Sequence, residues 1–335
     1  AATYAAEADA RVANKPAFVS VTTGPGGSNT LTGVACAYVD SIPLMIIAGQ
    51  VTSATMRDNG IRQRGMNELD MVAMMQPVTK LAMTLTDPGM VRYWLEKLFW
   101  VAEDGRPGPV FIEIPLDVQS AEIDPGALMS YEPSAPSLMP MHDLQLSAVK
   151  LCALLAYANR PLVLIGNGVR LAGGCNAALA FINKINVPVV TSWGAADIIP
   201  GDHHLLLGHC GLFGDRASNF ATQNCDLLIV LGSRLSVGQV GHSPKEFAKQ
   251  AKKVVVDIDY HEIHKWNYHV DLPVVDDVLE FMSAALLRSE LQVIGAPHGD
   301  LVVSVSERGL NHVELHVRRR LDGGLPLARE PVARV

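Results

Sequence analysis

A glycine-rich turn follows the first apolar run of the chain and leads into sequence typical of a helix. The run is Ala17–Val21, and the turn after it contains Gly24, Pro25, Gly26, Gly27, Ser28 and Asn29. Glycine has no Cβ, so such a turn lets a ligand approach bare backbone, and N–H groups at the start of a helix can point at that ligand. The spacing matches neither GxGxxG nor GxxxxGK(S/T), so an ordinary tight turn remains an equal alternative.

Three further strand ends in the second half of the chain carry glycine or aspartate. A GxG turn at 166–168 follows one apolar run, but Gly173 comes too late for a dinucleotide fingerprint. Carboxylates at the end of a parallel strand can accept hydrogen bonds from ribose hydroxyls. Together these ends favour a nucleotide-type pocket over chance turns. The other residues concerned are Gly232, Ser233, Arg234, Asp257 and Asp259.

The histidines do not form a metal-binding pattern. His203, His204 and His209 lie near one loop, but no acidic or cysteine partner has the spacing of a zinc site, which favours solvated histidines. No GxSxG sequence offers a serine nucleophile. We therefore predict no metal-ligating residues in this chain.

The composition limits the class of protein. The 335 residues are 49% hydrophobic and 18% charged, enough apolar content for about two cores. A net charge of −7 without a dense basic block argues against a nucleic-acid or acidic-membrane surface. Five widely spaced cysteines without a CxxC pair predict reduced thiols and a cytoplasmic location, and no apolar run is long enough for a membrane span.

Short apolar runs alternate with helical sequence along the whole chain, which predicts α/β folds with mostly parallel sheets. In the first half we expect a helix that begins at Ser28 or Asn29 as its cap. Beyond Leu291 the chain is rich in arginine and shows neither the helical nor the strand period of apolar residues. The expected strands are 17–21, 44–48, 110–114, 162–165, 187–190, 227–231 and 254–258, and the expected helices are 28–39, 90–102, 144–158 and 176–185.

Segment 115–140 is rich in Pro, Ser and Met and has too little periodic apolar content for a core element. We predict two doubly wound, mostly parallel-sheet domains, at 1–120 and 143–290, joined by a linker at 121–142 and followed by an irregular tail at 291–335.

Several strings in the first half resemble one enzyme family. TGPGGSNTLTG from Thr23, AYVDSIPL from Ala37, AGQV from Ala48, NELD from Asn67 and GRPGPV from Gly105 are similar to the pyrimidine-binding domain of acetolactate synthases and related thiamine-diphosphate enzymes. IGNG, TSWGAADIIPGDH, GLFGDRASN, LGSRL and VDIDYHEI resemble the Rossmann-like central domain of that family. The resemblance runs almost without a break from Ala1 to about Val293.

The resemblance implies a carboligase or decarboxylase that uses thiamine diphosphate and Mg²⁺ to act on 2-keto acids such as pyruvate, as in branched-chain amino acid biosynthesis. The turn from Gly24 to Asn29, with Gln50, would line the pyrimidine site. Asn67, usually Gln in acetolactate synthases, would face the reacting centre across a dimer interface. A homodimer or homotetramer is therefore expected, because the cofactor site is shared between subunits.

The resemblance also implies a structural FAD in the central domain. Here Leu235-Ser236-Val237 replaces the acidic run that usually follows the strand, which leaves flavin binding open. The positions that resemble flavin contacts are Gly211, Gly214, Gly232, Ser233, Arg234, Asp257 and Asp276.

Two departures from the family pattern lead to a further expectation. The proton-relay Glu of the family would lie just before Ala1, and no GDG followed by Asn occurs, so the Mg²⁺ and diphosphate ligands would come from a missing domain. We expect this fragment to be inactive alone. The alternative from a different class is a non-catalytic module that binds FAD or another nucleotide.

Overall fold

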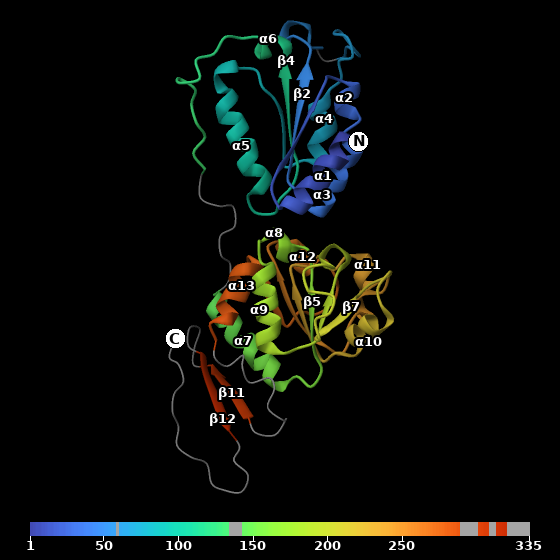
Figure 1. Ribbon diagram of the computed structural model, residues 1–335, viewed down its shortest axis with the longest axis vertical. Helices are drawn as coiled ribbons and strands as arrows, with labels where there is room; N and C mark the ends of the chain where they lie inside the picture. The colour runs from blue at the N-terminus through green and yellow to red at the C-terminus, as the bar shows by residue number, and fades with distance from the viewer. Residues whose placement is uncertain (58–59, 134–142, 289–300, 308–312, 320–335) are drawn as a thin grey trace. The chain divides into compact units, whose positions relative to one another are not determined.

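The computed structural model describes residues 1–57, 60–133, 143–288, 301–307 and 313–319 (Figure 1). The chain divides into two compact units, Ala1–Met139 and Pro140–Val335, each with its own sheet. The division falls inside the linker that the sequence predicts at 121–142, of which 134–142 lie outside the described residues. Both large sheets are parallel and flanked by helices, which confirms the α/β class.

The first unit is built on four parallel strands in the order β1-β2-β4-β3. Val110, Phe111 and Ile112 are fully buried in β4. Such continuous apolar runs are typical of parallel strands covered on both faces. The strands are β1 (Ala17–Val21), β2 (Leu44–Gln50), β3 (Leu81–Thr84) and β4 (Val110–Pro115).

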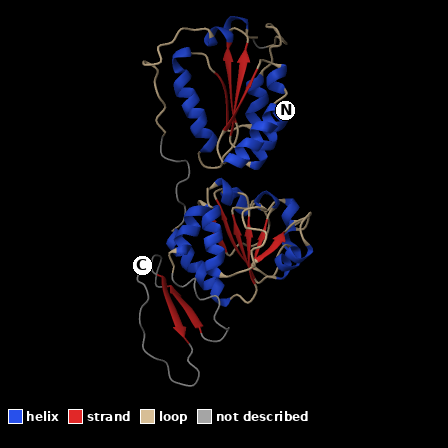
Figure 2. Cartoon of the chain, viewed as in Figure 1, coloured by secondary structure: helices blue, strands red, loops and turns tan. Residues whose placement is uncertain are grey.

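Helices cover both faces of this sheet: α5 lies on one side and α1 and α3 on the other (Figure 1 and Figure 2). Leu98 and Ala102 of α5 are fully buried and pack with Met45, Val110 and Ile112 of the strands. The longer helices are α1 (Ala2–Ala13), α3 (Leu31–Asp40), α4 (Met71–Met75) and α5 (Val91–Glu103). The short ones are α2 (Pro25–Ser28), η1 (Ser53–Thr55), η2 (Gln76–Val78), η3 (Pro88–Met90) and α6 (Leu116–Gln119).

The second unit has six parallel strands in the order β10-β9-β8-β5-β6-β7. Counted from the other edge, this is the doubly wound order 3-2-1-4-5-6, in which successive strands are added in one direction from β5 and in the opposite direction from β8. Ligands of such sheets bind beyond the carboxyl ends of the strands at this point. The strands are β5 (Pro161–Ile165), β6 (Val189–Thr191), β7 (Leu206–His209), β8 (Leu227–Leu231), β9 (Lys252–Asp257) and β10 (Leu272–Val275).

Alternate residues of these strands belong to two cores, one on each face. Val163 and Ile229 pack with α7, α9 and α13, whereas Leu164 and Val230 pack with the elements of the opposite face. The helices are α7 (Leu144–Tyr157), α8 (Gly168–Leu171), α9 (Cys175–Ile185), η4 (Trp193–Ala195), α10 (Arg216–Asn224), α11 (Val237–Val240), η5 (Pro244–Glu246), α12 (Tyr260–His264) and α13 (Val278–Leu286).

Most expected strands and helices occur within a few residues of their expected bounds, and two expectations are corrected. The helix expected at 28–39 is divided into α2 and α3, and its expected cap is wrong: Thr30 precedes α3, with no side-chain cap, and its hydroxyl donates to the Gly27 carbonyl at 2.6 Å. No regular element was expected beyond Leu291, but β11 (Leu301–Glu307) and β12 (Val313–Arg319) pair antiparallel there. The rest of that predicted tail lies outside the described residues.

Candidate functional site at the carboxyl edge of the first sheet

The turn after β1 is closed by the chain itself. Gly24 has a φ of +57°, and a Cβ there would overlap the backbone carbonyl of Asn67. Gly27 lies against the side chain of Met71, whose nearest atom would be 3.0 Å from an added Cβ. Gly26 lies against Thr22 in the same way, at 2.7 Å. The bare backbone of these three glycines therefore faces protein atoms. Packing within the chain explains why these positions are glycine without an approaching ligand.

The N–H groups of the turn are also largely used within it. Those of Gly26, Ser28 and Asn29 donate to the carbonyls of Thr23, Gly24 and Pro25, at 3.3, 2.9 and 3.1 Å. The expectation of free N–H groups directed at a ligand is corrected for these three residues.

One side of the turn nevertheless remains open to a ligand. Pro25 and Asn29 are exposed, and Gly26 and Ser28 are half-buried. The structure brings Asn67 next to this turn of the same chain, with its own φ at +60° and its side chain exposed. Met66 beside it is 83% exposed. Asn67, Met66 and the outer side of the turn thus form one accessible surface.

Side-chain hydrogen bonds behind the turn connect the segment after β1 with the strands β2, β4 and β3. The Thr23 hydroxyl donates to Oε1 of Gln50 at 2.9 Å, and Nε2 of Gln50 donates to the Glu113 carboxyl at 3.0 Å. From the neighbouring strand β3, the Thr84 hydroxyl donates to the same carboxyl at 2.7 Å. Gln50 also accepts from the Val51 N–H at 2.9 Å. Gln50 was predicted to contact the cofactor, and here its amide lies within this network.

Glu113 is buried, with only 3% of the residue exposed. Burial raises its pKa, and the negative charges of Asp70 and Glu68 raise it further, against the hydrogen bonds from Thr84 and Gln50. A raised pKa favours the uncharged acid at the centre of the network.

The pKa of Glu68, the neighbour of Asn67, is shifted in the opposite direction from that of Glu113. Burial alone would raise its pKa, but backbone N–H groups of Gly65, Arg64 and Arg57 hold the pKa of this carboxyl below its ordinary value. The bonds from Gly65 and Arg64 are both 2.9 Å. A buried carboxylate therefore fixes the loop from Arg57 to Gly65, directly before Met66 and Asn67.

In the second unit, two glycine turns predicted as ligand sites meet where the strand order reverses. The Gly168 N–H donates to the Gly232 carbonyl at 2.9 Å, and an added Cβ on Gly168 would lie 2.7 Å from the same oxygen. A Cβ on Gly166 would overlap Gly232 and Ser233. These glycines allow the turns after β5 and β8 to touch each other.

Beyond these turns lie two buried polar atoms without a partner. Among the described residues, Nε2 of Gln239 and Oδ2 of Asp276 have no hydrogen bond although both are buried. The Ser233 hydroxyl donates to Oε1 of Gln239 at 3.1 Å, and Oδ1 of Asp257 accepts from the Asp259 N–H at 3.0 Å. An unsatisfied donor and acceptor at the carboxyl ends of the strands are suited to a polar ligand.

The loop 210–215 holds two more of the residues predicted to contact flavin, Gly211 and Gly214. The Asn219 amide both accepts from the Gly211 N–H and donates to its carbonyl, at 2.8 and 2.9 Å. A Cβ on Gly214 would overlap the His209 carbonyl. The rings of Trp193 and Phe213 stack with their centroids 5.1 Å apart, and the two residues are 66% and 71% exposed.

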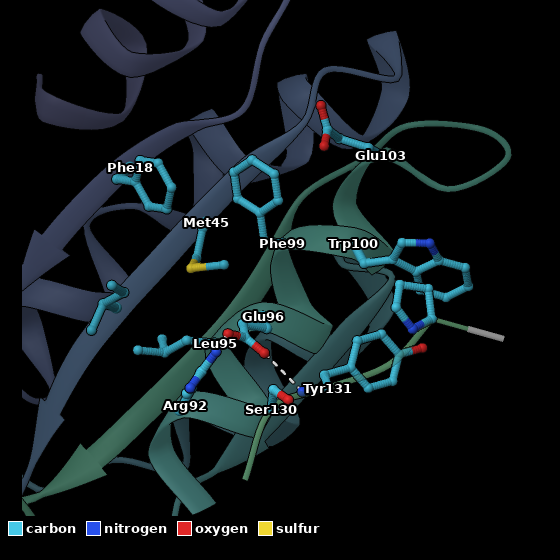
Figure 3. Close-up of a pocket in the computed structure, with 12 residues that line it drawn as sticks. Phe18, Met45, Arg92, Leu95, Glu96, Phe99, Trp100, Glu103, Ser130 and Tyr131 are labelled. Atoms are coloured by element: carbon cyan, nitrogen blue, oxygen red, sulfur yellow. Dashed lines mark hydrogen bonds and ion pairs between the residues drawn. The ribbon is translucent and has the colours of Figure 1, made fainter. Parts of the chain in front are cut away.

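A separate apolar pocket of about 740 Å³ lies between α5 and the first sheet (Figure 3). Phe18, Met45, Phe99 and Trp100 are among the side chains around it, and Glu96 accepts from the Tyr131 N–H at 2.7 Å at its edge. None of the predicted site residues lines it.

Two predicted absences can be compared with the described part of the chain. It contains no group of three or more His, Cys, Asp and Glu side chains suited to hold a metal ion. Its helices include none of the length and apolar character that crossing a membrane requires. None of the five cysteines, all of which lie in the described residues, forms a disulfide bond, and Cys152, Cys210 and Cys225 are buried.

Sequence reasoning missed four residues that organise these sites. Thr84 and Glu113 lie on strands far from the turn in sequence, and Glu68 was recognised only as part of a family string. The sequence of β4 gives one signal, since Glu113 is a single charged residue inside an apolar run. Gln239 has a local signal, because Ser236 and Gln239 have the spacing of a capping box, which the structure shows at α11.

Comparisons with known proteins agree with the division of the chain. Residues 1–74 match the family model described as thiamine pyrophosphate enzyme, N-terminal TPP binding domain, and residues 149–285 match the model of the central domain. A probable acetolactate synthase large subunit of Methanocaldococcus jannaschii is 35% identical over 303 residues, which are 87% of this chain and 49% of that protein. The acetolactate synthase large subunit of Lactococcus lactis is 32% identical over 314 residues, 91% of this chain and 51% of that protein. The chain spans about half the length of these curated relatives.

Proposed function

Since this chain belongs to the family of thiamine pyrophosphate enzymes, with its N-terminal and central domains, we propose that it forms part of an enzyme of the acetolactate synthase type. Thiamine diphosphate, when bound, supplies a thiazolium ring that accepts the electrons released when a 2-keto acid loses carbon dioxide. The proposed reaction joins two molecules of a 2-keto acid such as pyruvate. The similarity to acetolactate synthase large subunits supports this reaction type.

The observation that carries the proposal is the surface formed by the glycine turn and Asn67. Pro25, Gly26, Ser28 and Asn29 would contact the pyrimidine ring from the open side of the turn. Asn67 and Met66 are exposed next to it and would contact the substrate. Gln50 would act from behind, because its amide is committed to Thr23, Val51 and Glu113.

We further propose that the working enzyme is a homodimer or homotetramer, in which a second subunit completes the cofactor site. The exposed Asn67 and Met66 leave this surface accessible to a partner. Light scattering of the purified protein measures its mass in solution. A strictly monomeric protein that still turns over pyruvate would contradict this proposal.

The reaction is tested with protein expressed from the complete reading frame and supplied with Mg²⁺ and thiamine diphosphate. We expect consumption of pyruvate and formation of acetolactate, measured separately. Replacement of Asn67 by Gly, which also adopts its positive φ, should lower the turnover of pyruvate with little change in stability, whereas Arg62→Ala, an exposed change in the same loop, should have little effect. Failure to consume pyruvate or any of a range of 2-keto acids would exclude the proposed activity.

We also propose a flavin or other adenine nucleotide at the carboxyl edge of the second sheet. The unpartnered Nε2 of Gln239 and Oδ2 of Asp276 support it, because one is a donor and the other an acceptor. Isothermal titration with FAD should show micromolar binding that Asp276→Ala weakens about tenfold, as expected for one hydrogen bond to a charged group. Equal affinity of the variant, or no heat on titration of either protein, would reject this site.

A further inference from the structure

Within the network given above, Gln50 joins the segment before the glycine turn to the strand β4. Its Oε1 accepts from Thr23, immediately before Gly24, and from the Val51 N–H. Its Nε2 donates to Glu113 at 3.0 Å and to the Leu69 carbonyl at 3.3 Å. Glu113 fixes the orientation of this amide together with the Leu69 carbonyl and the Val51 N–H, because the two oxygens accept from the Nε2 end and the N–H donates to the Oε1 end.

We propose that Glu113 is a positioning residue for the glycine turn: by orienting the Gln50 amide it holds Thr23, and with it the turn, in the arrangement that receives the pyrimidine ring. Glu113 is 3% exposed, and its carboxyl group does not itself reach a ligand at the outer side of the turn. This inference rests on the function proposed above.

The other oxygen of the carboxyl group accepts a hydrogen bond from Thr84 on the neighbouring strand β3. Thr84 and Glu113 are register partners in β3 and β4, and their side chains are 2.7 Å apart. Glu113 is therefore held from β2 and from β3, and it cannot turn away from Gln50 without losing a buried hydrogen bond. The position of the turn on β1 is thus connected to the far edge of the sheet.

The charged groups that act on Glu113 are both negative. Glu68 and Asp70 lie on the segment before α4, and Asp70 is paired with Arg57 at 3.1 Å, whereas the groups from β2 and β3, Gln50 and Thr84, are neutral. The uncharged acid fits this environment, because it places no further charge beside Glu68 and Asp70 and its oxygens still accept from Thr84 and Gln50. Ionisation at higher pH adds a buried negative charge beside Glu68 and Asp70 and should loosen the turn.

The experiment compares Glu113→Gln and Glu113→Ala with wild type, and uses Glu103→Gln as a matched control. Glu103 also has a pKa raised by burial but lies outside the network. Hydrogen exchange of the amides of Ser28, Asn29 and Val51 reports on the turn. Binding of thiamine diphosphate with Mg²⁺ to the protein from the complete reading frame reports on the cofactor.

We expect Glu113→Ala to speed exchange at these amides about tenfold and to weaken cofactor binding by a similar factor, the usual consequence of an unsatisfied buried partner. Glu113→Gln should stay within about twofold of wild type, since its amide can accept from Gln50 and donate to Thr84. After correction for intrinsic rates, exchange in wild type should increase as Glu113 ionises, and this dependence should vanish in Glu113→Gln.

Two results would overturn the inference: exchange in Glu113→Ala equal to wild type, or equal losses in Glu113→Gln and Glu113→Ala with the same pH profile in all variants. If Glu113→Ala does not fold, the pH profiles of wild type and Glu113→Gln decide. The proposed function fails separately, if thiamine diphosphate does not bind wild type while exchange at the turn still responds to Glu113.

Discussion

Single residues at the first turn are constrained by neighbours that are distant in sequence. Gly24 has a left-handed φ because the chain must turn sharply after β1, and the Asn67 carbonyl occupies the space of a side chain there. Glu68 replaces solvent for three backbone N–H groups of the loop before it. The accessible surface at Asn67 therefore depends on residues that do not belong to it.

We expect Gly24→Ala to lower the free energy of unfolding of the first unit by about 2–4 kcal/mol, since it adds both backbone strain and overlap with Asn67. Urea denaturation measures this change. Gly49→Ala is the control, because the nearest atom to its Cβ would be Nε2 of Gln119 at an ordinary 3.6 Å. Equal stability of the two variants would contradict the packing described here.

Glu68→Gln should destabilise the same unit by about 2–3 kcal/mol at neutral pH, because an amide cannot accept from all three N–H groups. The folded pKa of Glu68 lies below its ordinary 4.5, so the ionised carboxylate contributes stability above that pH. This contribution is lost as the pH falls through the folded pKa. Urea midpoints measured between neutral and acidic pH should therefore converge for the two proteins, and a constant difference would count against the assignment.

At the scale of elements, side-chain caps determine where several helices begin. Asp143 caps α7 by accepting from the Leu146 N–H at 3.1 Å, and Asp70 caps α4 by accepting from the Ala73 N–H at 2.9 Å. Asp277 accepts from two N–H groups of α13, of Leu279 at 2.7 Å and Glu280 at 3.3 Å. Residue 277 thus separates β10 from a helix that covers the sheet.

Asp277→Ala should lower the stability of the second unit by about 1 kcal/mol, the usual value of an N-cap. Asp277→Asn keeps an acceptor oxygen and should lose much less. Thermal unfolding followed by circular dichroism compares the two. A loss as large for Asn as for Ala would mean that charge, and not the cap, is what Asp277 contributes.

At the scale of the whole molecule, the chain contains two separate parallel sheets with separate buried clusters. Each sheet places its candidate site at its carboxyl edge: the glycine turn and Gln50 in one, and Ser233, Asp257 and Asp276 in the other. This arrangement follows from parallel strands, whose carboxyl ends all meet at one edge.

Because each unit has its own core, calorimetry should resolve two unfolding transitions. Leu98→Ala, at a fully buried position of α5, should lower the free energy of unfolding of the first unit by about 2–5 kcal/mol. The transition of the second unit should stay in place. Leu116→Ala, at a position 57% exposed, is the control and should shift neither. A single transition that moves as a whole would show that the units unfold together.

The sequence by itself determined the α/β class, most of the buried strands and the position of the main turn. These features depend on local information: β-branched and aliphatic runs, the glycines between a strand and a helix, and Pro-rich sequence between the units. β3, β7 and β10 were missed, because they are four-residue strands that are only partly buried or have no clear period.

The tertiary structure alone decided what the predicted site residues contact. The network of Thr23, Gln50, Glu113 and Thr84 forms because strand order puts four distant residues on one edge, and no local pattern specifies that order. Gly24 needs to be glycine because Asn67 packs against it, which requires the loop held by Glu68. Sequence identifies residues capable of chemistry, whereas burial and pairing across strands determine which of them face a ligand and which hold the others in place.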